Sequence, residues 1–451
     1  MFKNILVILI PLLTYALLFS FIPNQKDLIL VTLLICTIIF WASSLLPDYQ
    51  TSLVFLFTAL AFSLSPKQII FSGFSSSAFW LVLAGMLIAA AIKNVHLSQR
   101  LTLFFTKLKN PSYLKILIII SIFALTFSFI MPSGMGRVVL LVPLGIIIAK
   151  NFGFEEGSKG YMGILFTIML STSMPAFTIL PANIPNMILT GLTSQIFDYE
   201  LLYSHYLIVN FLILGLIKNI LIVSLIYHFY KDTPKKIVIN TKKTKISKNE
   251  KIVIISLIVM LLLWTTDFIH GISPSIIAIA GVLFLMNPSI NIIKTKDINS
   301  INFSALIFLS ALIGVGSISA NNEFIKELLN SSINSFNLSD SHFLNYMKLN
   351  ILMVLSGVFL TQPTIPAIFT PMVEYLSTLS GFSTFELLMM QVAGFSTVVF
   401  PYQAPPLVIG LALANIKPVK MIKILLIITF VTLSVLFPLQ YLWMGFIKNI
   451  L

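Results

Sequence analysis

The sequence predicts an all-α polytopic membrane protein made of two inverted-topology repeats, with about 11 spans in total. Hydrophobic residues fill 58% of the 451 positions and charged residues only 10%. Apolar runs of span length recur along the whole chain, and a soluble protein could not bury so many of them. Four of these runs are interrupted by proline and glycine, and they form two matching pairs. Each repeat is therefore predicted to contain a re-entrant hairpin and a broken transmembrane helix.

The four interruptions occur at equivalent places in the two halves. Met131–Pro143 (MPSGMGRVVLLVP) has a fainter counterpart in Leu360–Pro371 (LTQPTIPAIFTP). About forty residues after each, a second broken patch follows, Leu180–Asn186 (LPANIPN) and Phe400–Pro406 (FPYQAPP). Lipid cannot hydrogen-bond freed backbone groups, so such breaks are tolerated only inside protein or along a cavity. Paired breaks in two halves indicate a transport site.

A hydrophilic segment separates the two halves. Residues 231–251 contain eight lysines and are predicted to form a cytoplasmic basic linker. Residues 1–230 then hold a first helix plus the first inverted repeat, and residues 252–451 hold the second repeat. The second half replays the order of the first, since Trp264 follows Leu263 where Trp41 follows Phe40. Such internal similarity is typical of transporters that arose by duplication.

The individual elements follow from the apolar runs. Turn residues 23–27 separate the first two helices, and a run too long for one span is interpreted as a hairpin or a broken span. The first run resembles a secretory signal but lacks a small-residue cleavage site, so it is predicted to be a retained helix. Residues 95–109 are amphipathic and are placed along the membrane surface. The predicted elements are 5–21, 28–46, 53–64, 78–92, the hairpin 114–150, the span 160–191 broken at Pro181–Pro185, 206–230, 252–268, 276–286, 305–320, the hairpin 353–375, the broken span 385–413 and 421–446.

The charges predict the orientation in the membrane. The chain has 28 basic and 15 acidic residues, for a net charge of +13. With the N-terminus in the cytoplasm, the lysine-rich loops all lie inside and the acidic loops outside, which is the usual bias. The positive charge then reflects topology and contact with anionic lipid, and it requires no nucleic-acid partner. The protein is accordingly expected in the cell inner (plasma) membrane as a multi-pass protein.

The residues favour transport over catalysis or signalling. No glycine-rich phosphate loop, metal-ligand cluster or nucleophile with its base is recognisable, so the chain is not predicted to be an enzyme. The single cysteine, Cys36, allows neither a disulfide framework nor a thiolate metal site. A membrane receptor would need an output domain, which is not visible. A cation, proton or metal-oxyanion transporter of the wider ion transporter superfamily is the alternative, although a cation exchanger should carry acidic residues at the broken helices and none occurs there.

Several ordered motifs resemble the divalent anion:sodium symporter family. They are MPSGMGRVVLLVP, ILPANIPNMILTG, LLWTTDFIHGI and INFSALIFLSALIGVG. The resemblance implies secondary active transport of a small anion, a di- or tricarboxylate or sulfate, by an elevator-type alternating-access mechanism. It also implies a homodimer in the lipid bilayer, with Na⁺ or H⁺ as the coupling ion and no other cofactor.

The hairpin tips depart from the pattern of that family. In the family a Ser-Asn-Thr triplet lies at each tip, with its Asn nine residues before a proline. The corresponding residues here are Ser133-Gly134-Met135 and Thr361-Gln362-Pro363. Only Ser133 and Thr361 keep the hydroxyl group that the resemblance assigns to a sodium site. The sequence therefore predicts weak or absent sodium coupling, with exchange or proton coupling as the substitute.

Arg137 is the single most informative residue, and Lys218 is a weaker candidate. Arg137 is one of only two arginines, and it lies just past the first hairpin tip in an apolar setting. A guanidinium matches a carboxylate or sulfate with its planar fork, and the alternative is that it pairs only with carbonyls of the broken hairpin. Lys218 falls near the middle of its span and is interpreted as an anion contact, a fixed cation replacing sodium, or a structural partner.

The substrate is predicted to lie near the midplane, between the two hairpin tips and the two broken spans. Helix N-termini after Ser133 and Thr361 would present backbone amides to an anion. The predicted substrate-binding residues are Ser133, Gly134, Arg137, Asn183, Pro185, Asn186, Thr361, Gln362, Thr364, Gln403 and Pro405.

Overall fold

A computed structural model describes residues 2–43, 45–95, 97, 111–131, 133–235, 246–334, 338–339 and 341–448. Every regular element in this described part is helical, which confirms the predicted all-α class. The chain forms two compact units. Unit 1 contains Met1–Trp80, Met187–Leu201 and Asn302–Phe395, and unit 2 contains Leu81–Asn186, Leu202–Ile301 and Ser396–Leu451.

Unit 1 is built around one long buried helix. α18 packs against α3, α4 and α5, and α20 packs against α23. The contact with α5 is close because position 73 is glycine: a Cβ there would collide with the carbonyl oxygen of Ser310 in α18. The helices of this unit are α1 (Phe2–Leu18), α2 (Gln25–Ser43), α3 (Asp48–Ala61), α4 (Lys67–Ile70), α5 (Ser72–Ser75), α18 (Phe303–Asn321), α19 (Glu323–Asn334), α20 (His342–Phe359), α21 (Thr364–Phe369), η4 (Thr370–Met372), α22 (Val373–Ser380) and α23 (Thr384–Phe395).

Unit 2 contains the remaining helices. Two further helices, α6 (Ser77–Asn94) and α11 (Ile184–Phe197), contain residues of both units. The helices of unit 2 are α8 (Tyr113–Ile130), α9 (Gly134–Asn151), α10 (Lys159–Ser173), η1 (Pro175–Thr178), η2 (Leu180–Ala182), α12 (Tyr203–Asn210), η3 (Phe211–Ile217), α13 (Lys218–Tyr230), α14 (Lys248–Thr265), α15 (Asp267–His270), α16 (Pro274–Met286), α17 (Thr295–Asn299), η5 (Pro401–Gln403), α24 (Pro405–Leu413), α25 (Val419–Val431), η6 (Thr432–Leu436) and α26 (Phe437–Ile447).

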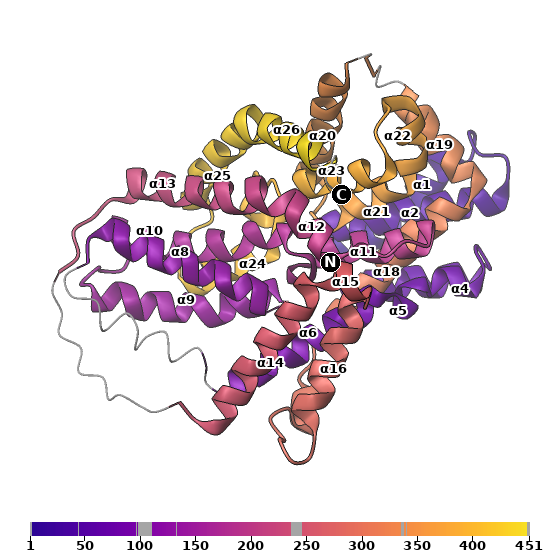
Figure 1. The fold of residues 1–451 in the computed structure, drawn as a ribbon. Helices are drawn as coiled ribbons and strands as arrows, with labels where there is room; N and C mark the ends of the chain where they lie inside the picture. The colour runs from indigo at the N-terminus through magenta and orange to yellow at the C-terminus, as the bar shows by residue number, and fades with distance from the viewer. Residues whose placement is uncertain are drawn as a thin grey trace. The chain divides into compact units, whose positions relative to one another are not determined.

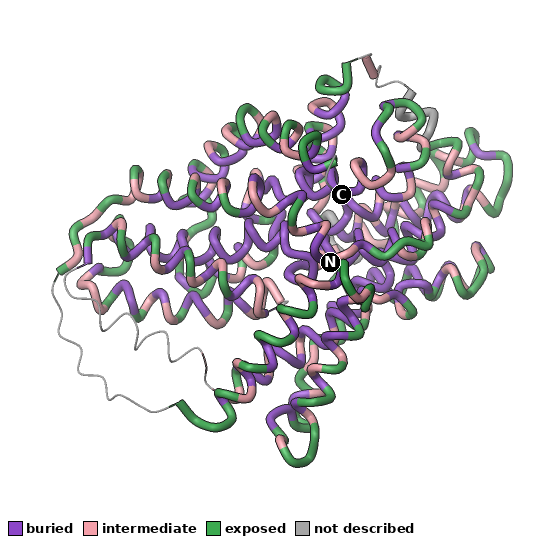
Figure 2. Tube along the Cα trace, viewed as in Figure 1, coloured by how far each residue is buried: buried purple, intermediate pink, exposed green. Residues whose placement is uncertain are grey.

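The centre of unit 2 is α10. It lies beside α8, α9 and α13 (Figure 1), and 13 of its 15 residues are buried (Figure 2). Hydroxyl groups join it to α8, since the Ser171 Oγ donates to the Ser121 Oγ at 3.1 Å and the Ser128 Oγ donates to the Thr172 carbonyl at 3.1 Å. A helix buried on nearly all sides is the core of a bundle.

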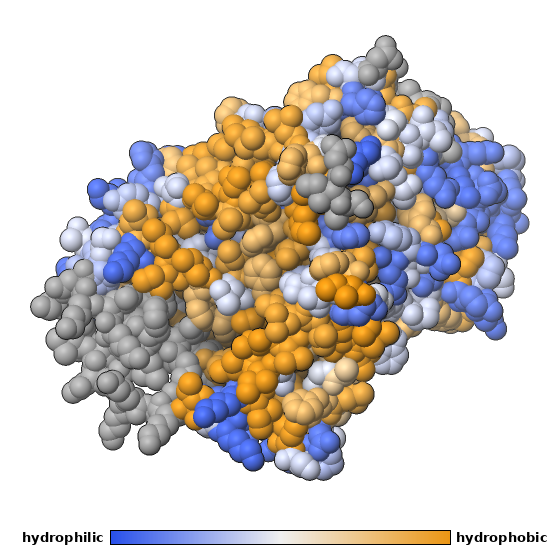
Figure 3. Space-filling model, in the orientation of Figure 1, coloured by the Kyte–Doolittle hydropathy of each residue, from blue (hydrophilic) through white to orange (hydrophobic). Residues whose placement is uncertain are grey.

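The outer helices of unit 2 present apolar side chains. Figure 3 shows hydrophobic residues over α14, α16 and the α25–α26 pair. Among the described residues, seven helical stretches are long and apolar enough to cross a membrane, and three shorter apolar helices accompany them. These outward faces suit lipid as their solvent, because exposed apolar surface on this scale is unfavourable in water.

The predicted hairpins and broken spans are present, with different boundaries. The first hairpin is α8 and α9, joined at residues 131–133, and the second is α20 followed by α21 and α22. The first broken span is interrupted from Met174 to Asn183, a longer stretch than predicted. Pro175 explains the early end, because it donates no backbone hydrogen bond and its ring clashes with a helical carbonyl four residues back. Pro185 lies in the first turn of α11, where proline is tolerated.

The compact units cut across the predicted halves. Each unit takes segments from residues 1–230 and from residues 252–451, and the second hairpin belongs to unit 1 while the first belongs to unit 2. The boundary proposed from the sequence separates repeats, and it stays a prediction. So does the expectation that both hairpin tips share one site. Most of the amphipathic segment 95–109 and of the basic linker lies outside the described residues.

Candidate functional site

The first hairpin tip is a helix N-terminus fixed by its own serine. α8 ends at Ile130 and α9 begins at Gly134, with Ser133 as its N-cap. The Ser133 Oγ accepts a hydrogen bond from the Gly136 backbone N–H at 3.1 Å. A capping serine satisfies one of the N–H groups that the first helical turn leaves without partners. The hydroxyl that the resemblance assigned to a sodium site thus acts as a cap here.

Arg137 connects this tip to the first broken span. Its side chain is fully buried, with an exposed fraction of 0%. The Nη1 atom donates to the carbonyl oxygens of Met131 at 2.5 Å and Ala182 at 3.0 Å. The Nη2 atom donates to the Asn183 Oδ1 at 3.3 Å. The guanidinium therefore holds three oxygens, two from the backbone and one from a side-chain amide.

One edge of the same guanidinium is not used by the protein. The Arg137 Nε is buried and has no hydrogen-bond partner among the described residues. Five N–H groups are available on an arginine side chain, and three are occupied. A buried donor without a partner carries a desolvation penalty of about 1–3 kcal/mol. This edge is the part of Arg137 that could still receive an anion.

Gly134 provides the space for this arrangement. A Cβ at position 134 would lie 2.7 Å from the Asn183 Oδ1 and 3.2 Å from the Pro406 Cγ. Any side chain here would push Asn183 away from Arg137. The glycine that replaces the family's asparagine is therefore part of the way Arg137 is held.

The first broken span is held together by two asparagines. The Asn183 Nδ2 donates to the Ser173 carbonyl at 3.4 Å, across the break. The Asn186 Nδ2 donates to the carbonyls of Ala176 at 3.0 Å and Ile179 at 2.6 Å. The carbonyls of Ala176 and Ile179 also accept the backbone N–H groups of Ile179 and Ala182, so Asn186 is a second donor to each and reinforces the two short 3₁₀ turns. Both asparagines, predicted as substrate ligands, have structural partners in unit 2.

The second broken span is held by a glutamine that accepts hydrogen bonds, whereas the two asparagines donate them. The Gln403 Oε1 accepts the backbone N–H groups of Val399 and Phe400, each at 2.7 Å. Pro405 is the first residue of α24, which packs against α9 of the first hairpin. Unit 2 thus brings together the first hairpin tip and both breaks.

The second hairpin tip, in unit 1, contains an unusual glutamine. Gln362 is 1% exposed, and neither its Oε1 nor its Nε2 has a hydrogen-bond partner among the described residues. Its neighbours Thr361 and Thr364 share a hydrogen bond between their hydroxyl oxygens at 3.2 Å. Because buried amides are nearly always paired, an unpaired one indicates a ligand, an ion or a water molecule.

Replacing Gln362 by leucine should separate binding from stability. Removing a buried amide that has no protein partner should leave the unfolding temperature unchanged or raise it, while anion uptake should fall at least about tenfold if the amide binds substrate. Gln391→Leu is the matched control in unit 1, because the Gln391 Oε1 accepts a hydrogen bond from the Thr370 hydroxyl at 3.0 Å and should lose stability. Uptake by the Gln362→Leu protein at the wild-type rate would remove Gln362 from the site.

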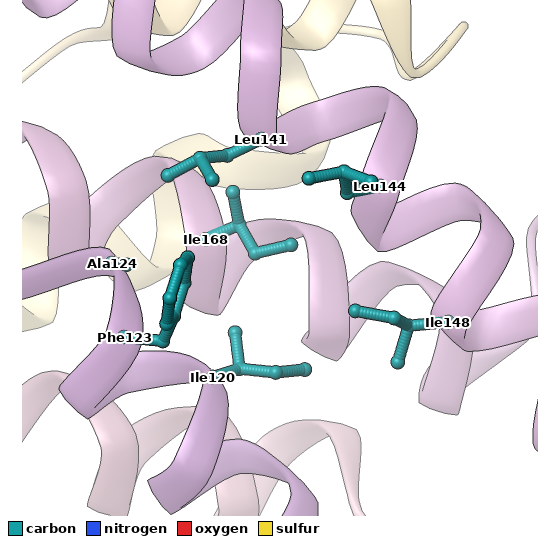
Figure 4. A pocket seen from close by; sticks show the side chains of 7 residues that line it. All are labelled: Ile120, Phe123, Ala124, Leu141, Leu144, Ile148 and Ile168. Atoms are coloured by element: carbon teal, nitrogen blue, oxygen red, sulfur yellow. The ribbon is translucent and has the colours of Figure 1, made fainter. Parts of the chain in front are cut away.

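A cavity within unit 2 is too small and too apolar for an anion. It lies between α8, α9 and α10 and has a volume of about 20 Å³, room for about one water molecule. Figure 4 shows only carbon atoms on the side chains that line it. The lining residues are Ile120, Phe123, Ala124, Leu141, Leu144, Ile148 and Ile168. This cavity is a packing gap and carries no function.

The sequence missed two contributors to unit 2. Pro406 restricts position 134, and Ser173 closes the network behind Asn183. Neither is chemically distinctive, so only the folded geometry identifies them. Within the described residues, no group of three or more His, Cys, Asp or Glu side chains could hold a metal ion.

Comparisons with known proteins identify a family and a similar fold. A family model described as the sodium:sulfate symporter transmembrane region matches residues 1–449. A membrane protein of Cupriavidus necator H16 is 27% identical over 137 residues, which is 30% of this chain and only 27% of that protein's length. The crystal structure of the Alcanivorax borkumensis YdaH transporter, described as having an unusual topology, has a TM-score of 0.54 at 14% identity. The structural match covers 84% of this chain and 87% of the YdaH chain, and the likeness concerns the fold alone.

The match along nearly the whole chain agrees with the motifs, the apolar spans and the paired helix breaks. It confirms the resemblance found in the sequence at the level of family and fold, and the family is one of secondary anion transporters in membranes. The chain belongs to the sodium:sulfate symporter family.

Proposed function

We propose that this protein moves a small dianion or trianion, a di- or tricarboxylate or sulfate, by secondary active transport. The observation that carries the proposal is Arg137, a fully buried cation at the junction of a hairpin tip and a helix break. Charged side chains within membrane spans are costly and usually mark a substrate pathway. The unpartnered Nε edge of Arg137 and the amides of the first turn of α9 supply donors to an anion.

Sodium coupling is proposed to be weak. The Ser133 hydroxyl caps α9, and the acceptor oxygens of Met131, Ala182 and Asn183 already hold the guanidinium. A sodium ion at the first hairpin would have to compete with a tethered cation for the same oxygens. Exchange of one anion for another, or proton coupling, would then drive transport.

Uptake into proteoliposomes tests both statements. Purified protein should accumulate labelled succinate, citrate or sulfate when the vesicles contain an unlabelled anion. Replacing sodium by choline outside should change the rate less than about twofold, since no ion needs to bind before the anion does. Empty vesicles and Arg137→Gln vesicles are the controls. Absence of uptake for every anion would contradict the transport proposal, and uptake that rises steeply with sodium would contradict the coupling proposal.

The remaining features of the proposal concern mechanism and assembly. Alternating access is proposed to be of the elevator type, with the first hairpin moving as a rigid body, in a homodimer in the cell inner membrane with the N-terminus in the cytoplasm. The hydrogen bonds from Arg137 to the first break and the packing of α24, which follows the second break, against α9 support movement as one body. Crosslinks that fix the hairpin tip to a static helix should stop uptake, and uptake that survives them would rule out this mechanism.

A further inference from the structure

Unit 2 contains a second buried cation that the proposed anion site does not use. Lys218 lies within the span Tyr203–Tyr230 and has an exposed fraction of 0%. In the described part of the chain, no carboxylate forms an ion pair with it. A lysine held in a membrane span without an acidic partner is rare, because its charge is expensive to bury and must be compensated by other polar groups.

A π-helix sets the position of Lys218. η3 (Phe211–Ile217) is π-helical and ends at the residue before Lys218. It packs against η1 in the first broken span, and this approach needs Gly215, where a Cβ would lie 2.7 Å from the Thr178 Oγ1. A π segment widens the helix and rotates the residues that follow, and such segments are frequent at functional sites. The local fold thus points the Lys218 side chain into the protein interior.

The side chain of Lys218 reaches the second break. Its Nζ donates to the Ser396 carbonyl at 2.9 Å. Ser396 is the first residue after α23, where the end of a helix leaves carbonyls without intrahelical partners. Other groups in the break are satisfied by side chains, since the Thr429 hydroxyl donates to the Val398 carbonyl at 3.3 Å and Gln403 accepts two backbone N–H groups. Lys218 is the cationic member of this set.

Carbonyls at unwound segments and at the ends of broken helices are the groups that bind Na⁺ in secondary transporters. An ammonium group has the same charge and donates to the same oxygens. We infer that Lys218 is a built-in monovalent cation for the second broken span, which binds carbonyl oxygen in place of an ion taken from solution. It is a positioning residue, because it needs no contact with the transported anion.

The first broken span has a matching arrangement. The Arg137 guanidinium holds the Ala182 carbonyl and the Asn183 amide oxygen in this span. It also holds the Met131 carbonyl at the first hairpin tip. At each break in unit 2, a cationic side chain of the protein itself therefore binds backbone carbonyl oxygen, in place of an ion taken from solution. The inference rests on the proposed function only in treating these breaks as transport machinery.

The test replaces Lys218 by small residues, which leave the position of its ammonium group empty. In Lys218→Ala and Lys218→Ser, sodium should bind the freed carbonyl and stabilise the full-length protein. The unfolding temperature of each variant in detergent, without any transported anion, should be at least about 2 °C higher in sodium chloride than in choline chloride at equal ionic strength. Wild type and Lys423→Ala should show no such difference. Lys423 is the matched control, since it is exposed and its Nζ lies 4.8 Å above the Phe229 ring.

A third variant keeps the inference testable even if the small ones fold poorly. Lys218→Met fills the same volume without charge, so it should unfold below the wild-type temperature and should not recover in sodium. A Lys218→Met protein as stable as wild type would overturn the inference, as would small variants whose stability is the same in both salts. Because no di- or tricarboxylate or sulfate is present, these outcomes do not depend on whether the transport proposal is correct.

Discussion

Replacing Arg137 by glutamine is expected to destabilise the protein and abolish uptake. The change removes the donors from two buried carbonyls and one buried amide oxygen, and each unsatisfied group costs about 1–3 kcal/mol. The folded yield and the unfolding temperature should fall first, because Arg137 ties the hairpin tip to the break. Thermal unfolding of purified protein, measured beside uptake, checks this.

Two further variants define what Arg137 does. Arg137→Lys keeps the charge but offers three donors from one atom, so it should recover part of the stability and little of the anion affinity. Arg100→Gln, the change at the only other arginine of the sequence, is the control and should leave both quantities unchanged. An Arg137→Gln protein with normal stability and unchanged stabilisation by succinate, citrate or sulfate would show that Arg137 neither stabilises the fold nor binds the anion.

Gly134→Asn is the second substitution for which we expect a large effect. The change restores the residue type that the family resemblance suggests, yet it should reduce uptake at least about tenfold and should not create sodium dependence. The reason is steric: the new Cβ would lie 2.7 Å from the Asn183 Oδ1, so Asn183 must leave the Arg137 Nη2.

Smaller changes at glycine positions test that reason. Gly134→Ala adds only the Cβ and should already cause most of the loss of uptake, whereas Gly445→Ala adds a Cβ with nothing within 4 Å and should leave uptake unchanged. The unfolding temperature and the uptake rate are the two measurements. Full activity of Gly134→Asn, with or without sodium, would show that Asn183 does not need to hold Arg137.

The sequence was sufficient to predict the class of fold and the places where helices break. Long apolar runs and prolines such as Pro181 and Pro405 act locally, so their consequences can be predicted without knowing any contact. Helix boundaries could not be predicted as well. Pro175 ends α10 earlier than the more obvious Pro181, and α19 was missed because its polar sequence gave no apolar run. The division into two compact units depends on contacts between distant segments, which no local pattern encodes.

The candidate site shows a similar limit. Arg137 could be selected because a charge inside a span is rare, and that argument needs no structure. Its partners could not be chosen, because carbonyls such as those of Met131 and Ala182 are identical in every residue. The same holds for Gln403, whose amide serves its own backbone, a role that its position between two prolines does not reveal.

The burial of α10 also affects how the protein is assembled in the membrane. Among the five candidate spans of the described residues up to Tyr230, the span Lys159–Thr178, which contains α10, is the least apolar and the most deeply buried. It contains Thr167, Ser171, Thr172 and Ser173. Its Ser171 hydroxyl donates to α8, and the Ser128 hydroxyl of α8 donates to its Thr172 carbonyl, so α10 gains polar contacts from α8 that lipid cannot provide. Synthesis from the N-terminus delivers α8 and α9 before α10. The order of the chain therefore lets the most polar span enter the bilayer against protein surfaces that are already in place.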